Sequence, residues 1–411
     1  MKRLTYLAAT TALVGGITGS AMAAELEVTH WWTSAGEAAA LGAFADAFNS
    51  TGNTWVDGAI AGGGGTAIPA IISRIVGGNP MGATVMVHGR QAEELVEAGL
   101  MRDLTELAEE EGWADLVQPA SLLDACTYDG KIYCVPTNIH SQQWMWLSHA
   151  AYDAAGVDVP TDWNAFVAAA PALREAGLVP MAMGNDGFQH YLTFNTIIGS
   201  LGGPELYKTI YGDRDMDVVR GPKVAEMFQA LANVRELSAG SNVGGWNEAT
   251  NLVITGKAGG QIMGDWAQAE FAVAGQTAGT DYECLPGLGV NPIVNTGGNA
   301  FYFPVLDDEE ASAAQLELAS VMISPEAQVG FNLAKGSLPV RGDINMDSAN
   351  ACMQKGLEIL AAGNIIPGVE QYVTADTLAS LRDLASRFLA DDSMSAEAAQ
   401  EEFASIIEQA E

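Results

Sequence analysis

Large aromatic side chains stand beside hydroxyl and carboxylate groups at several places in this chain. Nine tryptophans are present, and those with polar neighbours are Trp31 and Trp32 ahead of Ser34 and Glu37, Trp246 in "VGGWNEAT", and Trp266 directly after Asp265. A sugar ring has apolar C–H faces and a fringe of hydroxyl groups, so a site for it needs flat aromatic rings with carboxylates and amides around them. Any one tryptophan is more often a core residue. The combination nevertheless favours sugar recognition.

The signatures of common catalytic chemistry are weak or missing. The patterns HExxH, GxSxG and GxxxxGK[ST] do not occur, and the five histidines form no helical metal-binding pair. The glycine run in "AGGGGTAIPA" formally matches a dinucleotide fingerprint, but a loop ahead of a helix is the better interpretation. A carboxylate pair for glycoside hydrolysis stays an open alternative, because 51 Asp and Glu residues guarantee many chance neighbours. The sequence predicts no metal and no cofactor.

The N-terminus has the pattern of a secretory signal peptide, predicted to span residues 1–24. Lys2 and Arg3 precede the short apolar run "LTYLAATTALVGGI", and Ala21-Met22-Ala23 is a small-x-small cleavage site. No later stretch is apolar over the ~20 residues that a membrane helix needs. We therefore expect an exported, periplasmic protein.

The charge balance restricts the partners. The chain carries 18 Lys and Arg against 51 Asp and Glu, a formal net charge of −33. Such a chain is repelled by nucleic acid and by anionic membrane surfaces. Because the acidic residues are spread along the sequence, we interpret them as a solvated surface and not as an acidic tail. No nucleic-acid partner is expected.

Four cysteines are too few and too widely spaced for a disulfide scaffold or a CxxC metal site. In an exported protein an even number favours pairing. The segment "CTYDGKIYC" has two short strand-like runs around Asp129-Gly130, a hairpin turn that would bring Cys126 opposite Cys134. The preferred pairing is therefore Cys126 with Cys134 and Cys284 with Cys352.

Strand and helix patterns alternate along the chain and would position these side chains. "ELEVTHWW" is followed by the capping-box pattern of Ser34 and Glu37 and by helical spacing of apolar residues. "TDWNAFVAAAPALREAG" predicts a helix that ends before Gly177, and "SPEAQVGFNLAKG" predicts one between Ser324 and Gly336. The alternation indicates an α/β fold with mostly parallel sheets.

Five segments, in order, resemble landmarks of one protein family. They are "VTHWWTSAGEAAALGAFADAFNSTG", "GGNPMGATVMVHGRQAEELVEAGLMRDLTEL", "YCVPTNIHSQQWMWLSHAAYDAAGVDVPTDWNAF", "GKAGGQIMGDWAQAEF" and "FNLAKGSLPVRGDI". The chain resembles periplasmic sugar-binding proteins of ABC importers, of the maltose-binding-protein type, and within them the glucose/mannose-binding branch. The likeness covers nearly the whole chain after the predicted signal peptide.

This resemblance implies a two-lobed periplasmic-binding-protein fold with a hinge and an interlobe ligand cleft. One lobe would take residues 25–137 and 300–334, and the other would take 138–299 and 335–411. Closure of the cleft is the motion that the membrane permease subunits of an ABC importer would read, so the protein would carry a sugar without changing it. We expect a monomer that performs no catalysis.

The resemblance also implies a set of ligand-binding residues. Trp31 and Trp32 would face Trp246 and Trp266 across the cleft. The polar positions are Glu37, His88, Asn138, His140, Asp265, Asn299, Lys335 and Gln371. Asn299 stands where the glucose branch commonly has Asp, and Gln371 stands where it tends to have His. These two departures count against glucose as the ligand more than against sugars as the class of ligand.

Three alternatives stay open. A monosaccharide such as glucose or mannose is the preferred ligand, but an oligosaccharide or polyol binder of the same family fits the tandem tryptophans too. A secreted glycoside hydrolase or lyase would share the aromatic and acidic residues. A receptor for an anionic or amino-acid ligand is disfavoured, because few arginines lie near the aromatic segments.

Overall fold

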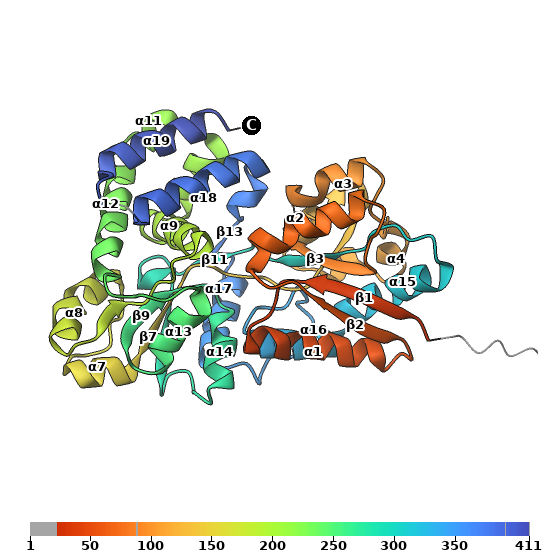
Figure 1. Cartoon of the computed structure of the whole chain (residues 1–411), viewed down its shortest axis with the longest axis horizontal. Helices are drawn as coiled ribbons and strands as arrows, with labels where there is room; N and C mark the ends of the chain where they lie inside the picture. The colour runs from red at the N-terminus through yellow and green to blue at the C-terminus, as the bar shows by residue number, and fades with distance from the viewer. Residues whose placement is uncertain (1–22, 88, 391, 411) are drawn as a thin grey trace, which may run out of the picture.

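The computed structural model describes residues 23–410, except 88 and 391, and it is an α/β protein with two lobes side by side. Each lobe is built on its own sheet, with helices packed around it (Figure 1). The chain enters on the right-hand lobe of Figure 1, and the C-terminal helices lie on the left-hand lobe. The predicted fold class is therefore confirmed. The predicted signal peptide falls almost entirely outside the described residues.

The first sheet has five strands in the order β2-β1-β3-β12-β6. Their bounds are β1 (Glu25–His30), β2 (Thr54–Ala59), β3 (Ala83–Val87), β6 (Cys134–Pro136) and β12 (Asn299–Tyr302). β1 pairs in parallel with β2 and β3, whereas β12 runs antiparallel to both β3 and β6. A strand from late in the chain thus lies between two strands from its beginning.

The second sheet has four strands in the order β10-β7-β9-β8. They are β7 (Trp144–Ser148), β8 (Val179–Met181), β9 (Ala258–Ile262) and β10 (Tyr282–Pro286). Only β8 and β9 are parallel, since β7 runs antiparallel to β9 and β10. The expectation of mostly parallel sheets is therefore wrong. Strands that come directly from the other lobe enter each sheet from the opposite end, and this reverses their direction.

Helices surround both sheets. Around the first sheet lie α1 (Ala35–Asn49), α2 (Gly63–Val76), η1 (Arg90–Ala92), α3 (Glu93–Glu97), α4 (Thr105–Glu110), α5 (Trp113–Leu116), α6 (Ser121–Asp124), α15 (Glu309–Ile323) and α16 (Pro325–Lys335). The remaining helices are α7 (His149–Ala155), α8 (Trp163–Glu175), α9 (Gly187–Gly202), α10 (Pro204–Lys208), η2 (Thr209–Asp213), α11 (Met216–Val219), α12 (Pro222–Leu237), α13 (Trp246–Ile254), α14 (Ala267–Val273), η3 (Gly287–Gly289), α17 (Ala351–Ala361), η4 (Val369–Gln371), α18 (Ala375–Ala390) and α19 (Ala396–Glu408).

Two small ladders complete the fold. β4 (Thr127–Tyr128) pairs with β5 (Lys131–Ile132), and β11 (Val294–Asn295) pairs in parallel with β13 (Ile365–Ile366). The second ladder joins the segment ahead of β12 to the segment ahead of η4. It therefore ties the return crossing to the C-terminal part of the chain.

The helix boundaries follow the local sequence signals. α1 has the predicted capping box, in which Ser34 and Glu37 each accept a hydrogen bond from the other's backbone N–H. Asp162 caps α8 through its side chain, Ser324 caps α16, and Gly336 ends α16 with a φ of 77° that favours glycine. The predictions for these three helices are confirmed.

Each lobe has its own hydrophobic core. In the first lobe the buried rings of Phe44 and Phe331 stack at 4.2 Å, joining α1 to α16. In the second lobe Trp144 and Trp146 stack at 5.6 Å under a layer of helices that includes α9. A third buried cluster packs between α2 and β3 on the first sheet, so the apolar interior is divided between the lobes.

Both predicted disulfides are present. Cys126 pairs with Cys134 across the β4–β5 hairpin, whose turn residues Asp129 and Gly130 both have positive φ, as a type I′ turn requires. Cys284 on β10 pairs with Cys352 on α17. The second disulfide thus fixes the C-terminal segment to the edge of the second sheet.

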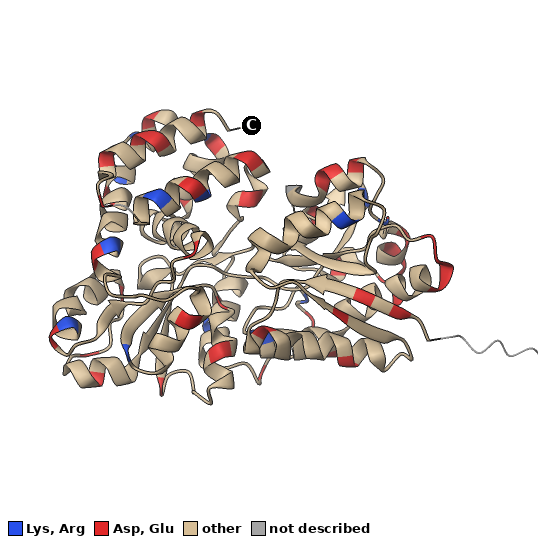
Figure 2. Cartoon of the chain, viewed as in Figure 1, with Lys and Arg blue, Asp and Glu red and all other residues tan. Residues whose placement is uncertain are grey.

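Acidic residues are distributed over both lobes. Figure 2 shows Asp and Glu spread over helices and loops, with far fewer Lys and Arg among them. This distribution agrees with a solvated acidic surface. Among the described residues, no helix combines the length and the apolar character needed to cross a bilayer.

We predict that the two disulfides stabilise the fold unequally. They close loops with sequence separations of 8 and 68 residues. The chain-entropy relation gives about 2.6 kcal/mol for the short loop and about 4.4 kcal/mol for the long one. Urea unfolding of Cys126→Ala/Cys134→Ala and of Cys284→Ala/Cys352→Ala, each against the parent chain, measures the difference. Equal losses, or free thiols in the intact parent protein, would contradict it.

Candidate functional site

The candidate site is built where the chain passes between the two sheets. The first passage leaves β6 and reaches β7, and it carries Asn138 and His140. Asp265 follows β9 on the second sheet, and Lys335 is the last residue of α16. All four of these side chains are buried. Residues far apart in the sequence thus meet at the junction of the lobes.

His140 and Asp265 form a buried pair. His140 Nδ1 lies 2.8 Å from Asp265 Oδ1, and the Ser141 backbone N–H donates to Asp265 Oδ2 at 2.8 Å. Burial raises the pKa of the Asp265 carboxyl, against the opposing effect of His140. Burial also lowers the pKa of His140, against the opposing effect of Asp265. Burial therefore favours the neutral form of the His140 imidazole beside the Asp265 carboxylate.

The hydrogen bonds assign the tautomer of His140. Asn138 Nδ2 lies 3.0 Å from His140 Nε2, and an amide nitrogen can only donate. Asn138 Oδ1 accepts from the Asn299 backbone N–H at 3.1 Å, which fixes the orientation of the amide. His140 Nε2 is therefore the acceptor and Nδ1–H donates to Asp265. Neither ring nitrogen is left for proton transfer to a substrate.

Glu37 and Lys335 form a second buried pair, close to Trp32. Lys335 Nζ donates to Glu37 Oε1 at 2.9 Å and lies 4.8 Å from the centroid of the Trp32 ring. Burial by itself raises the pKa of Glu37, but the charge and hydrogen bond of Lys335, helped by Ser34, hold it below its ordinary value. Glu37 thus serves the capping box and the ion pair together.

Aromatic rings gather around Trp266. Its ring lies 4.9 Å from His140 edge to face, 5.9 Å from Phe188 and 6.5 Å from Trp246. Phe188 stands on the first turn of α9 and is 43% exposed, unusual for a large apolar side chain. The sequence prediction missed Phe188. The local signal for it is its place in the first turn of a helix, directly after the Asp186 cap and Gly187.

The tandem tryptophans have different surroundings. Trp32 is only 2% exposed and packs against Phe301 and Phe331 in the core of the first lobe. Trp31 is half-buried and lies against Gly64 at the start of α2. Packing in the core therefore fixes the position of the Trp32 ring, which faces Lys335.

Asn299 and Gln371 are the remaining predicted positions that the structure describes. Asn299 starts β12 opposite Val87 of β3. Gln371 ends η4, and its Nε2 is buried with no hydrogen-bond partner among the described groups. His88 lies outside the described residues.

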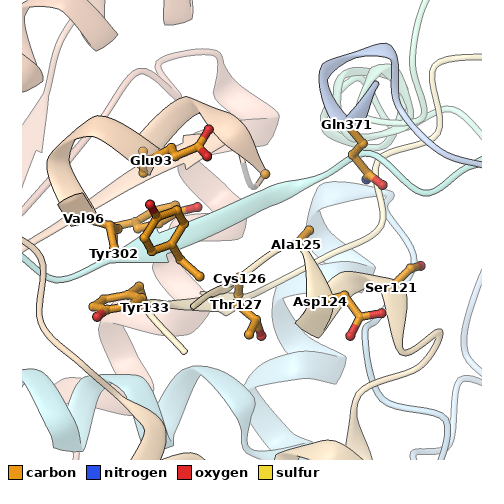
Figure 3. Close-up of a pocket in the computed structure, with 13 residues that line it drawn as sticks. Glu93, Val96, Ser121, Asp124, Ala125, Cys126, Thr127, Tyr133, Tyr302 and Gln371 are labelled. Carbon is orange, nitrogen blue, oxygen red and sulfur yellow. The ribbon is translucent and has the colours of Figure 1, made fainter. Parts of the chain in front are cut away.

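A cavity of about 310 Å³ opens beside Gln371 (Figure 3). Its walls are Gly89, Ala92, Glu93, Val96, Ser121, Asp124, Ala125, Cys126, Thr127, Tyr128, Tyr133, Tyr302 and Gln371. In the part of the chain that the structure describes, no cluster of three or more His, Cys, Asp or Glu side chains could hold a metal ion. The cavity wall itself combines aromatic, hydroxyl and carboxylate side chains.

The chain belongs to the bacterial extracellular solute-binding protein family, whose sequence pattern matches residues 31–329. A probable sugar-binding periplasmic protein of Rhizobium meliloti (strain 1021) is 37% identical over 89% of this chain and 87% of the relative. A protein of the same description from Mesorhizobium japonicum is 38% identical over 86% and 85%. Among solved structures, a chitin oligosaccharide binding protein superposes with a TM-score of 0.76 at 18% identity, over 94% of this chain and 99% of that one.

We predict that Lys335→Met lowers the free energy of unfolding by about 3 kcal/mol at pH 7, because it leaves Glu37 buried without its cation. Since Lys335 holds the pKa of Glu37 below 4.5, its stabilisation is full above that pH and is lost as the pH falls through the lowered value. Urea unfolding at pH 7 and at pH 3 should therefore show a smaller difference in acid.

The matched control is Lys257→Met, which removes an exposed lysine on the turn after α13. Surface substitutions of this kind change stability by about 0.5 kcal/mol or less. A loss at Lys335 no larger than at Lys257, or one independent of pH, would contradict the role given to the ion pair.

Proposed function

We propose that this protein is an extracytoplasmic receptor that captures a sugar between its two lobes and delivers it to the permease of an ABC importer. The observation that carries the proposal is the aromatic group of Trp246, Trp266 and Phe188 beside the His140–Asp265 pair. Rings of this kind suit the C–H faces of a sugar, and buried carboxylates and amides suit its hydroxyl groups. The description of both bacterial relatives as probable sugar-binding periplasmic proteins supports the class of ligand and the periplasmic location.

The proposed site spans two lobes with the predicted boundaries. Residues 25–137 and 300–334 would form one lobe, and 138–299 with 335–411 the other. The strands of the first sheet all fall in the first set apart from Asn299, and those of the second sheet fall in the second. The proposed ligand contacts are Trp31, Trp32, Glu37, His88, Asn138, His140, Trp246, Asp265, Trp266, Asn299, Lys335 and Gln371, with Phe188 added. The protein would act as a monomer.

Binding without catalysis fits the site better than hydrolysis does. A glycoside hydrolase needs one protonated and one ionised carboxyl facing the same bond. Here Glu37 is held by Lys335, and Asp265 is held by His140 and the Ser141 N–H. Both carboxylates are therefore already paired with groups of the protein itself. Glucose or mannose is the proposed unit at the aromatic group, with a polyol or an oligosaccharide as alternatives.

We predict that Trp266→Ala weakens sugar binding at least fivefold, about 1 kcal/mol, because an aromatic face is lost. Titration of intrinsic fluorescence and calorimetry with glucose, mannose, galactose and xylose measure the change. Trp55→Ala is the control, since Trp55 is half-buried on β2 at the edge of the first sheet. Equal affinities for the Trp266 variant and the parent would remove this ring from the site.

We also predict that saturating sugar reduces the radius of gyration without changing the oligomeric state. A ligand held between two lobes stabilises the closed arrangement over the open one. Small-angle scattering with and without the sugar that binds best measures this change. Unchanged scattering would argue for a site within one lobe. Chromatography after long incubation with glucose oligomers should show no product, and cleavage would favour the hydrolase.

A further inference from the structure

We propose that His30 is a positioning residue for the tandem tryptophans, and that its protonation releases the loop that carries Trp31 and Trp32 and weakens sugar binding in acid. His30 is the last residue of β1, directly ahead of this loop. The effect on sugar affinity rests on the proposed function, whereas the effect on the loop can be measured without any sugar.

Both ring nitrogens of His30 have a hydrogen-bond partner. The Trp32 backbone N–H lies 3.2 Å from His30 Nδ1, and His30 Nε2 lies 2.5 Å from Asp57 Oδ1. His30 is only 1% exposed, so water has little access to either bond. A backbone N–H can only donate, so Nδ1 is the acceptor and carries no proton. Nε2–H therefore donates to the Asp57 carboxylate, and the ring is the neutral Nε2–H tautomer.

The hydrogen bond to Trp32 closes a turn. A side-chain acceptor that binds the backbone N–H two residues later is the pattern of an Asx turn, which Asn and Asp usually form. In this chain the imidazole of His30 supplies the acceptor instead. The turn fixes the backbone of Trp31, which lies between the two bonded residues. It therefore determines where the half-buried Trp31 ring contacts Gly64 at the start of α2.

β2 supplies the second partner of the ring. β1 and β2 lie side by side in parallel at the edge of the first sheet (Figure 1). The Asp57 side chain on β2 is 64% exposed, whereas that of His30 is buried. A nearby carboxylate favours the charged form of an imidazole, and burial disfavours it. Asp57 therefore stabilises a proton that arrives on His30 as the pH falls.

Protonation of His30 breaks the turn on one side only. The added proton binds Nδ1, because Nε2 already carries one. Nδ1–H and the Trp32 N–H are then two donors that face each other without an acceptor. A buried N–H that loses its acceptor is destabilising, so the two groups separate. Histidine is the side chain whose charge ordinarily changes between about pH 5 and 8, so the turn is intact at the upper end of this range and opens at the lower end.

The loop yields more easily than the strand or the core. His30 is held in β1 by pairing with β2, and the ring of Trp32 is held in the core of the first lobe. The separation therefore displaces the backbone between them at Trp31, together with the exposed Thr33 that follows. Since Trp31 is a proposed sugar contact, this displacement lowers the affinity for sugar.

The charged groups around the loop come from three elements. Asp57 is on β2, Glu37 is on α1, and Lys335 is on α16 with its Nζ 4.8 Å from the centroid of the Trp32 ring. Glu37 and Lys335 are paired with each other. Because Lys335 holds the pKa of Glu37 below its ordinary value of 4.5, Glu37 keeps its charge between pH 5 and 8. The charge that changes beside the loop in this range is therefore that of His30.

The first measurement needs no sugar. Nitrogen-15 NMR of the imidazole rings should show His30 as the Nε2–H tautomer at pH 8, and the tryptophan fluorescence of the ligand-free protein should change as this ring titrates. His30→Asn keeps an acceptor for the Trp32 N–H but does not titrate, so its fluorescence should be the same at pH 5 and pH 8. An Nδ1–H tautomer or a charged ring at pH 8, or the same fluorescence change in His30→Asn, would overturn the inference.

The second measurement is calorimetric titration at pH 8 and pH 5 with whichever of glucose, mannose, galactose and xylose binds best at pH 8. We expect the parent to bind more weakly at pH 5 by about threefold or more, the scale of one weakened hydrogen bond, and His30→Asn to lose this difference. His30→Leu removes the acceptor and should show the weaker binding already at pH 8. Asp57→Asn removes the carboxylate that favours the charged ring, so its loss of affinity should begin at a lower pH. Every variant retains His140 and Asp265, so only the effect of His30 differs among them.

The control is His149→Asn, the same substitution at a half-buried histidine on α7 of the second lobe, which should keep the pH dependence of the parent. Thermal unfolding at both pH values shows whether each variant is folded, and Asp57→Asn, at an exposed position, tests the pair if His30→Leu is not. If sugar binds with a dependence on Trp266 but His30→Asn keeps the pH dependence of the parent, this inference is wrong and the proposed function stands. If no sugar binds at all, the proposed function is wrong, and the NMR and fluorescence titrations decide the role of His30 in the loop.

Discussion

The buried carboxylate of Asp265 is the interaction on which the junction of the lobes depends. It accepts hydrogen bonds from His140 and from the Ser141 backbone, both on the first passage between the sheets. Because the carboxylate lies outside water, each of these bonds is costly to break. Through His140 and Asn138 the same hydrogen bonds reach the start of β12, on the return passage. The two passages between the lobes are therefore joined to each other by hydrogen bonds.

The rigidity of the lobes complements this junction. Each lobe has its own close-packed core, and each core resists deformation more than the few residues of a passage do. The Cys284–Cys352 disulfide fixes α17 to the second sheet, so the C-terminal segment moves with that lobe. Gly336 packs so closely on Gln268 that a methyl group at this position would lie 2.7 Å from the Gln268 Cβ. Close packing thus also holds the passage that follows α16.

The acidic residues determine the charge of the protein surface, whereas the binding chemistry depends on a few groups at the candidate site. The formal net charge of −33 comes from acidic residues spread over both lobes, and it makes the surface unattractive to anions. At the candidate site, Glu37 is balanced by Lys335, and Asp265 accepts hydrogen bonds from His140 and the Ser141 backbone. A neutral, hydroxyl-rich ligand can enter such a place without bringing a charge out of water. The surface and the site therefore favour the same class of ligand for separate reasons.

The sequence by itself determined the features that depend on neighbouring residues. The capping box of α1, the ends of α16 and the turn at Asp129-Gly130 follow from side chains and backbone preferences within a few positions. The resemblance to solute-binding proteins also came from the order of short segments. It located the polar residues around His140 that the structure then brought into contact.

Only the tertiary structure decided features that depend on distant segments. The antiparallel place of β12 between β3 and β6 depends on where the chain returns from the second lobe, and no local period encodes that. Trp31 and Trp32 are chemically alike in sequence, yet packing buries Trp32 in a core and leaves Trp31 half-exposed. The cavity at Gln371 exists because η4 and the β4–β5 hairpin, which lie far apart in the sequence, approach each other. A sequence pattern cannot specify such an approach, since it arises from the packing of the whole fold.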